Sequence, residues 1–318
     1  MEYYGVLESI LQALVAGLLI GALYGLMSVG VGVIFGVMQV VNFAQGEFLM
    51  LGMYASLYML GAAGGSLLIG AAFSPFLTAV LAGPILFAVG YLVHRFLLAR
   101  LTGIRVGGID GAGHYGQLIL TLGLSLVLQN GALMLFGSTP QSVRTPLSSH
   151  AWEIGVIGED VVVFVNQARS VAFVVSIVIA GLLFWFINRS RTGKALKAAS
   201  DNAAAAIYMG IDVDRAHRLA FGIGAAVTGI AGGLVATYNS FQPYIGMQFI
   251  IVMYAGVVLG GMGSILGAFW GGMLIGLVQE LSVLFLPMQL QSAAIFVFFL
   301  LVVQLLPQGL FGRISERT

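Results

Sequence analysis

The sequence predicts an all-α, polytopic integral membrane protein with about eight or nine transmembrane helices, some of them glycine-rich and discontinuous. Hydrophobic residues account for 59% of the 318 residues and charged residues for only 8%, whereas about 25% of residues in soluble proteins are charged. The apolar runs are continuous, which favours helices over the alternating strands of a membrane barrel. A water-soluble protein is therefore excluded. The net charge of +1 also excludes the basic surface of a nucleic-acid-binding protein.

Seven apolar stretches are long enough to cross a hydrocarbon core of about 30 Å, which takes roughly 20 helical residues. They cover residues 10–37, 48–68, 76–93, 118–136, 171–187, 219–238 and 290–306. An eighth region, 249–286, is too long for one span and too rich in glycine for a uniform helix. We expect it to hold either two crossings or one crossing and a broken helix.

Basic residues set the expected orientation, because Lys and Arg concentrate in cytoplasmic loops. They fall in two connections and at the end of the sequence, at His94, Arg95, Arg100 and Arg105, then Arg189, Arg191, Lys194, Lys197, Arg215 and Arg218, then Arg313 and Arg317. We therefore expect loop 189–218 to be cytoplasmic and loop 137–170 to be extracytoplasmic. This arrangement matches nine crossings, whereas eight would require a re-entrant segment.

The extracytoplasmic loop 137–170 is expected to carry a small β-hairpin. Its acidic residues outnumber its basic ones, with Glu153, Glu159 and Asp160 against Arg144 and Arg169. Residues 161–165 are four valines and a phenylalanine, residue types that favour strands. The loop is too short to be a domain of its own, so residues 1–318 are expected to form a single transmembrane domain.

The cytoplasmic loop 189–218 contains an alanine-rich helix former from Lys194 to Met209, with Gly210 placed as its C-cap. Small apolar residues on it recur at spacings close to three and four, namely Leu196, Ala199, Ala203, Ala206, Ile207 and Gly210. Such a stripe predicts a packing face. The face either docks on a partner or packs on the chain's own bundle.

Glycines recur at spacing four in two parts of the chain, which lets helix backbones approach closely in lipid. These glycines are Gly17, Gly21 and Gly25, then the pair Gly256 and Gly260, then Gly263, Gly267 and Gly271, then Gly272 and Gly276. The pattern predicts tight helix packing.

Polar residues interrupt the apolar blocks at Asn42 to Glu47 and again at Glu280. A carboxylate at mid-membrane costs about 2.5 to 3.5 kcal/mol on insertion scales, so it normally faces a cavity or a partner. If these residues lie at interfacial depth instead, they are ordinary helix-end residues. Transporters built from repeats show short, glycine-interrupted segments around the substrate path. The tentative path residues are Asn42, Gln45, Glu47, Gly260, Gly261, Gly263, Ser264 and Glu280.

Sequence motifs of enzymes are absent. Gly193 and Lys194 do not belong to a P-loop, because Asn188 stands where the first Gly is needed and Ala195 where Ser or Thr is needed. The four histidines lack metal-ligand spacing, and there is no cysteine. We expect no catalytic residue, no metal and no cofactor on this chain.

Four segments together resemble the branched-chain amino acid permease family of ABC importers, specifically the shorter of its two permease subunits. They are residues 42–47, the loop from Arg191 to Asp212, residues 239–246 and residues 260–268. The resemblance spans about 14–312. One departure is Gln45, where the family commonly has His, a difference that bears on specificity if this position contacts substrate.

The resemblance implies a permease in the bacterial plasma membrane that works with a second, homologous permease, two cytoplasmic ATPases and an extracytoplasmic solute-binding protein. It implies that the alanine-rich loop is the helix that couples to an ATPase. The coupling residues are then Arg191, Gly193, Lys194, Ala198, Ala199, Asp201, Asn202 and Gly210. Branched-chain or other aliphatic amino acids are the implied cargo, with urea or short amides as the alternative. A passive channel or an intramembrane enzyme using Glu47 and Glu280 is a further alternative.

Overall fold

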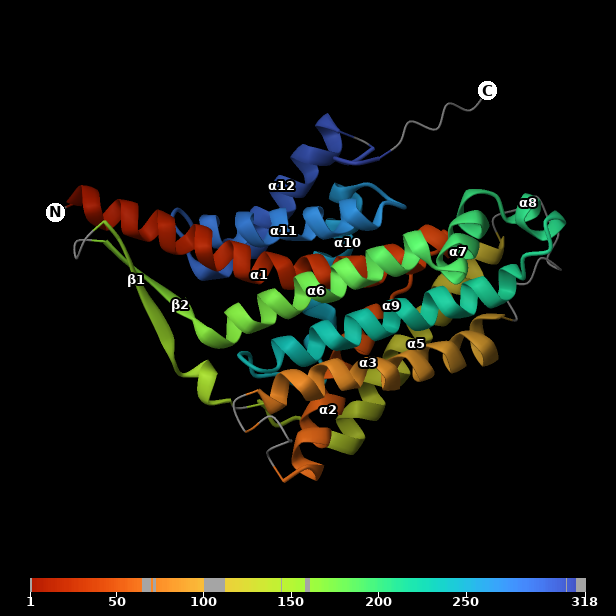
Figure 1. The fold of residues 1–318 in the computed structure, drawn as a ribbon, viewed down its shortest axis with the longest axis horizontal. Helices are drawn as coiled ribbons and strands as arrows, with labels where there is room; N and C mark the ends of the chain where they lie inside the picture. The colour runs from red at the N-terminus through yellow and green to blue at the C-terminus, as the bar shows by residue number, and fades with distance from the viewer. Residues whose placement is uncertain are drawn as a thin grey trace.

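The computed structural model describes residues 2–64, 70, 73–99, 112–143, 145–157, 161–306 and 308–312. These residues form a helical bundle with one β-hairpin (Figure 1), which confirms the predicted polytopic helical fold. Seven charged residues used in the orientation argument lie outside the described residues, namely Arg100, Arg105, Arg144, Glu159, Asp160, Arg313 and Arg317.

Nine helices of 15 residues or more make up the described bundle. They are α1 (Glu2–Met38), α2 (Gln45–Ala62), α3 (Ser74–Val93), α5 (Ala112–Phe136), α6 (Gln167–Arg189), α9 (Val213–Val235), α10 (Ile245–Gly260), α11 (Ile265–Ser282) and α12 (Gln291–Leu305). A π-turn, η1 (His94–Leu98), extends α3, and two short 3₁₀ turns are η2 (Pro146–Ser148) and η3 (Met288–Leu290). The region 249–286 thus lies in two helices, α10 and α11.

Six of the described helices are long and apolar enough to cross a membrane, and α10 and α12 are shorter apolar helices. The six are α1, α3 with η1, α5, α6, α9 and α11. Residues 48–62 of the predicted span at 48–68 lie in α2, which is not one of the six, and residues 65–68 lie outside the described residues. Its first turn holds Gln45 and Glu47, and protein surrounds that turn, so α2 does not need a wholly apolar surface there. The number of crossings, eight or nine, stays a prediction.

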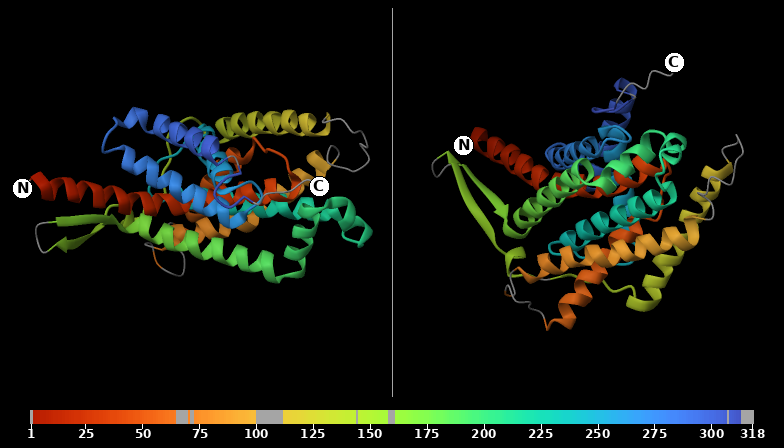
Figure 2. Two further views of the ribbon diagram at one scale, coloured as in Figure 1. Left: turned by 90° about the horizontal axis from the view of Figure 1, so that it is seen from above. Right: turned by 45° about the vertical axis from the view of Figure 1, so that its right-hand side comes forward.

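The bundle is built around α1 and α9. Helix α11 packs along α1, α3 and α2 pack along α9, and α10 packs on α11. Figure 2 shows α5 and α6 on the outside of this group. The N-terminus and the hairpin lie at one end of the bundle, the hairpin end, and α7 (Arg191–Asp201) and α8 (Ala203–Tyr208) lie at the other, the loop end (Figure 1).

Glycines join the inner helices backbone to backbone, as their spacing predicts. A Cβ added at Gly21 of α1 would lie 2.6 Å from the Met273 carbonyl oxygen of α11, and one added at Gly276 would lie 2.5 Å from the Gly21 nitrogen. Between α10 and α11, a Cβ at Gly271 would lie 2.7 Å from the Gly260 nitrogen. Gly263 is the exception in the predicted set, because it sits in a turn with φ +94° and has open space beside it.

The predicted hairpin is present as β1 (Ala151–Ile157) and β2 (Val161–Asn166), paired antiparallel. The outer edge of β2 is tied to α1, because the Gln12 amide donates to the Phe164 carbonyl at 2.8 Å and accepts from the Phe164 N–H at 2.9 Å. These two bonds pair the backbone N–H and carbonyl of Phe164, which lie on the edge of β2 that a two-stranded hairpin leaves unpaired.

Candidate functional site

The connection between α1 and α2 is a non-helical segment inside the bundle. It begins at Gln39, whose φ of +54° places it in the left-handed region. The Tyr254 hydroxyl of α10 accepts from the Asn42 N–H at 2.7 Å and donates to the Asn42 carbonyl at 2.8 Å. The Asn42 side chain accepts from the Ala44 N–H at 3.1 Å. Irregular backbone at membrane depth is tolerated only where such partners satisfy it.

Gln45 fixes this segment to the middle of α9. Its amide nitrogen donates to the Thr228 hydroxyl at 2.5 Å and to the Gly224 carbonyl at 3.2 Å, and its oxygen accepts from the Asn42 amide at 3.0 Å. Gly224 and Thr228 lie near the midpoint of α9. The polar segment is therefore buried halfway along a helix long enough to cross a membrane, rather than at a helix end.

Glu47 is the ionisable residue of this segment, and its side chain is 1% exposed. One carboxylate oxygen accepts from the Ser125 hydroxyl of α5 at 3.2 Å, and the other has no hydrogen-bond partner among the described residues. Space for this carboxylate comes from Gly246 of α10, where an added Cβ would lie 3.2 Å from Glu47 Cδ. The structure thus brings Asn42, Gln45 and Glu47 together.

Glu280 belongs to a different group. It follows Gln279 near the end of α11, where Gln279 accepts from the Tyr24 hydroxyl at 2.9 Å. Arg169, which interacts electrostatically with Glu280, lies over the Tyr238 ring at 5.3 Å. Glu47 contacts α5 instead, so the two carboxylates share no partner within the described residues. Sequence spacing could not separate these two groups.

The predicted residues Gly260 to Ser264 form the turn between α10 and α11. Gly261 and Gly263 have φ values of +99° and +94°, which glycine adopts without strain. Ser264 caps α11 by accepting from the Gly267 N–H at 3.1 Å. The carbonyls of Leu259 and Gly260 accept from the backbone of residues 310 and 311, at 2.8 and 3.1 Å.

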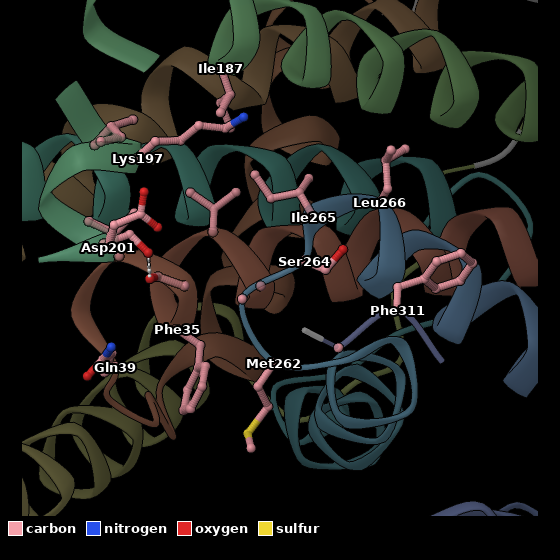
Figure 3. A pocket seen from close by; sticks show the side chains of 18 of the residues that line it. Phe35, Gln39, Ile187, Lys197, Asp201, Met262, Ser264, Ile265, Leu266 and Phe311 are labelled. Atoms are coloured by element: carbon pink, nitrogen blue, oxygen red, sulfur yellow. Dashed lines mark hydrogen bonds between the residues drawn. The ribbon is translucent and has the colours of Figure 1, made fainter. Parts of the chain in front are cut away.

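A cavity of about 1100 Å³ opens beside this turn (Figure 3). Gly263 and Ser264 line it on one side, and Lys197 and Asp201 of α7 line it on another. The cavity also reaches Leu118 in the first half of α5. That α7 shares a cavity with the α10–α11 turn could not be predicted from local pattern, because the cavity joins segments about 60 residues apart.

The predicted helix from Lys194 to Met209 is wrong as one continuous element. Asn202 breaks it into α7 and α8 with an extended backbone, φ −157° and ψ 100°. The Asn202 side chain caps α8 by accepting from the Ala205 N–H at 2.9 Å. Asparagine favours such caps over helix interiors, and this local preference outweighs the alanines around it. Gly210 does adopt the predicted left-handed conformation, with φ +78°.

Part of the apolar stripe of the loop faces the chain's own bundle, which is one of the two expectations. Leu196, Ala199 and Ala206 are buried, and the Ser200 hydroxyl donates to the Gly36 carbonyl at the end of α1. Ile207 of the stripe is 41% exposed, and the two most exposed apolar residues of the loop follow it, where sequence spacing did not point. Tyr208 is 90% exposed and Met209 82%.

The other predicted coupling residues divide between the two faces of the loop. The exposed ones are Arg191, Lys194, Asp201, Asn202 and Gly210, of which Asp201 also lines the cavity. Gly193 is buried against Ile187, and Ala198 is half-buried.

Comparison with known proteins finds one family that matches most of the chain. The family model for the permease component of branched-chain amino acid transport systems matches residues 13–305. The high-affinity branched-chain amino acid transport system permease protein LivH of Escherichia coli K12 is 31% identical over 309 residues, covering 95% of this chain and 96% of the relative. BraD of Pseudomonas aeruginosa, with the same description, is 30% identical over 309 residues, with the same coverage. A probable LivH of Methanocaldococcus jannaschii is 27% identical over 271 residues, covering 82% and 77%.

Proposed function

This chain belongs to the family of branched-chain amino acid transport system permease components, and we propose that it is the membrane subunit of an ATP-driven importer. In this proposal it sits in the bacterial plasma membrane and moves branched-chain or other aliphatic amino acids into the cytoplasm. It pairs with a second homologous permease, two cytoplasmic ATPases and an extracytoplasmic solute-binding protein. The names of its relatives support the amino-acid cargo.

The observation that carries the proposal is the buried polar segment Asn42 to Glu47. Its Gln45 side chain is hydrogen-bonded to the midpoint of α9. Burying polar and ionisable groups at that depth is costly, and such groups mark solute paths in membrane proteins. A broken backbone at mid-depth is also the usual construction of a transporter substrate site. The permease role and the chemistry of this segment therefore agree.

The α7–α8 loop supplies the proposed ATPase contact. Tyr208 and Met209 project from its tip, while α7 packs on the bundle and is bonded to the end of α1 through Ser200 and Gly36. An exposed apolar tip on an anchored helix suits docking into a groove of a soluble subunit. We place the ATPase on Tyr208 and Met209 rather than on Ala199, because Ala199 is buried within the chain.

The test is leucine uptake by the importer reconstituted in liposomes with its binding protein and with ATP on the ATPase side. Tyr208→Glu is expected to abolish uptake and to reduce co-purification of the ATPases, while the amount of folded permease is unchanged. Trp152→Glu, a half-exposed position at the hairpin end, is the matched control and should retain the ATPases.

Three outcomes contradict the proposal in different ways. Uptake by wild type without ATP would identify a passive channel. Uptake of urea or a short amide but not leucine would overturn the cargo. Normal ATPase binding by Tyr208→Glu would overturn the docking site.

A further inference from the structure

Helix α5 carries a strip of polar residues that sequence reasoning did not single out. Its members, hereafter the α5 polar strip, are Gln117, Thr121, Ser125 and Gln129. A step of four residues advances only about 40° around a helix, so the four side chains follow one continuous band. The opposite face of α5 is apolar and open, with Ile119 71% and Val127 69% exposed.

The α5 polar strip faces the candidate site. The Thr121 hydroxyl lies 3.4 Å from the Phe43 N–H and accepts its hydrogen bond, and the Ser125 hydroxyl donates to Glu47 at 3.2 Å. Gln117, Thr121 and Gln129 are buried. The strip is therefore one wall of a polar seam whose other wall is the segment Asn42 to Glu47.

Two buried polar atoms on this seam have no hydrogen-bond partner within the described part of the chain. One is the second carboxylate oxygen of Glu47, and the other is the amide oxygen of Gln117, whose side chain is 5% exposed. Both are acceptors. Buried polar groups normally have a hydrogen-bond partner, and in membrane proteins such acceptors face water or a solute.

A band of leucines runs beside the strip. Leu120, Leu124 and Leu128 pack with Phe48 and neighbouring apolar side chains. One end of the seam meets the cavity, which Leu118 and Val41 line. A polar band with two unpaired acceptors beside an apolar band matches a solute that carries a hydrogen-bond-donating cation next to an aliphatic side chain.

We propose that the α5 polar strip and Glu47 form the track that carries the ammonium end of an aliphatic α-amino acid through the permease, with the Glu47 carboxylate as its ammonium contact. The leucine band receives the aliphatic side chain, and the track delivers the solute to the cavity at the loop end. This inference rests on the proposed function and extends it to named contacts.

The first experiment uses the absence of cysteine from the chain. Single cysteines replace Gln117, Thr121, Ser125 or Gln129, with Ile119→Cys and Val127→Cys as controls on the opposite face of α5. The reconstituted importer is treated during ATP turnover with a membrane-impermeant cationic thiosulfonate. Strip positions should react about tenfold faster than the controls, and saturating leucine should slow them by a similar factor, because the strip is expected to be wet and occupied in use.

The second experiment tests the charge. At Ser125→Cys, the ratio of the reaction rates of a cationic and an anionic thiosulfonate should fall about tenfold when Glu47→Gln is added, since the carboxylate attracts the cation at short range. The amide of Glu47→Gln keeps the shape of the side chain. Glu47→Gln should reduce leucine uptake by more than Val127→Ala, a substitution on the outer face of α5, changes it.

Strip cysteines that react no faster than the controls would overturn the inference, as would an unchanged rate ratio in Glu47→Gln. These failures are distinct from failure of the proposed function, which shows as absent ATP-dependent uptake by the wild-type importer. Normal leucine uptake by the Glu47→Gln importer would leave the proposed function intact and overturn the assignment of Glu47 as the ammonium contact.

Discussion

Glycines of the central helices and glycines of the outer helices have opposite surroundings. Side chains added at Gly52 of α2 or Gly232 of α9 would collide with the backbones of Gly229 and Leu49, respectively. Side chains added at Gly131 of α5 or at Gly181 of α6 would meet nothing within 4 Å. The comparison shows that glycine content alone does not indicate packing. Inside a helix, close approach of a neighbouring backbone is what makes a glycine indispensable.

The largest expected effect is that of Gly52→Leu. Its side chain has no room beside Gly229, and overpacking of this kind costs about 3 kcal/mol or more. We expect the variant to lose the monodisperse peak of the folded chain in detergent chromatography. Gly131→Leu, the matched control on α5, should elute like the wild type. Equal behaviour of the two variants would remove the distinction between inner and outer glycines.

An intermediate effect is expected at Gly276, and a comparison with Gly36 tests whether the distance to the neighbouring backbone sets the cost of replacing a glycine. A Cβ at Gly276 would lie 2.5 Å from the Gly21 nitrogen, whereas a Cβ at Gly36 would lie 3.6 Å from Gly263 Cα, an ordinary contact. Gly276→Ala should lower the free energy of unfolding by about 1 to 3 kcal/mol. Gly36→Ala should leave it unchanged or raise it by up to about 1 kcal/mol, because alanine is the better helix former. Denaturant titration of both variants in mixed micelles measures the two free energies of unfolding. A Gly36→Ala variant that is destabilised as much as Gly276→Ala would contradict the prediction.

The smallest effect is expected in the α7–α8 loop, where a cap rather than a close backbone contact begins α8. Asn202→Ala removes the acceptor of the Ala205 N–H and should destabilise α8 locally by about 1 kcal/mol. Amide exchange at Ala205 should become about fivefold faster, as that free energy implies. Asn202→Asp retains a capping oxygen and should exchange like wild type. A slower exchange in Asn202→Ala would mean that α7 and α8 merge into one helix.

Much of the bundle follows from periodicity and composition. The apolar runs predict most of the long helices, the valines at 161–163 predict the hairpin, and glycines at spacing four predict the α1–α11 contact. Each of these is a local pattern whose physical meaning hardly depends on distant residues. The polar segment Asn42 to Glu47 was detectable for the same reason, as a break in an apolar run.

Features set by tertiary partners were not predictable from local pattern. The stripe through Leu196 and Ala199 indicates a packing face without saying what covers it, and the structure covers it with the chain's own helices. Glu47 and Glu280 look equivalent in the sequence, yet one meets α5 and the other lies in the group of Arg169. The polar strip of α5 is hidden between exposed leucines and valines, and only its orientation distinguishes it from a lipid-facing helix.

The backbone contact between α1 and α11 also has a mechanical consequence. Where a carbonyl oxygen of one helix fits against a glycine Cα of the other, sliding by a single residue would drive side chains into that backbone. Interiors packed in this way switch between discrete arrangements rather than deform gradually. We therefore expect α1 and α11 to move together as a single rigid unit. Any displacement that opens a passage is then expected to involve helices without such interlocking, and among the described helices of that kind α5 carries the polar strip.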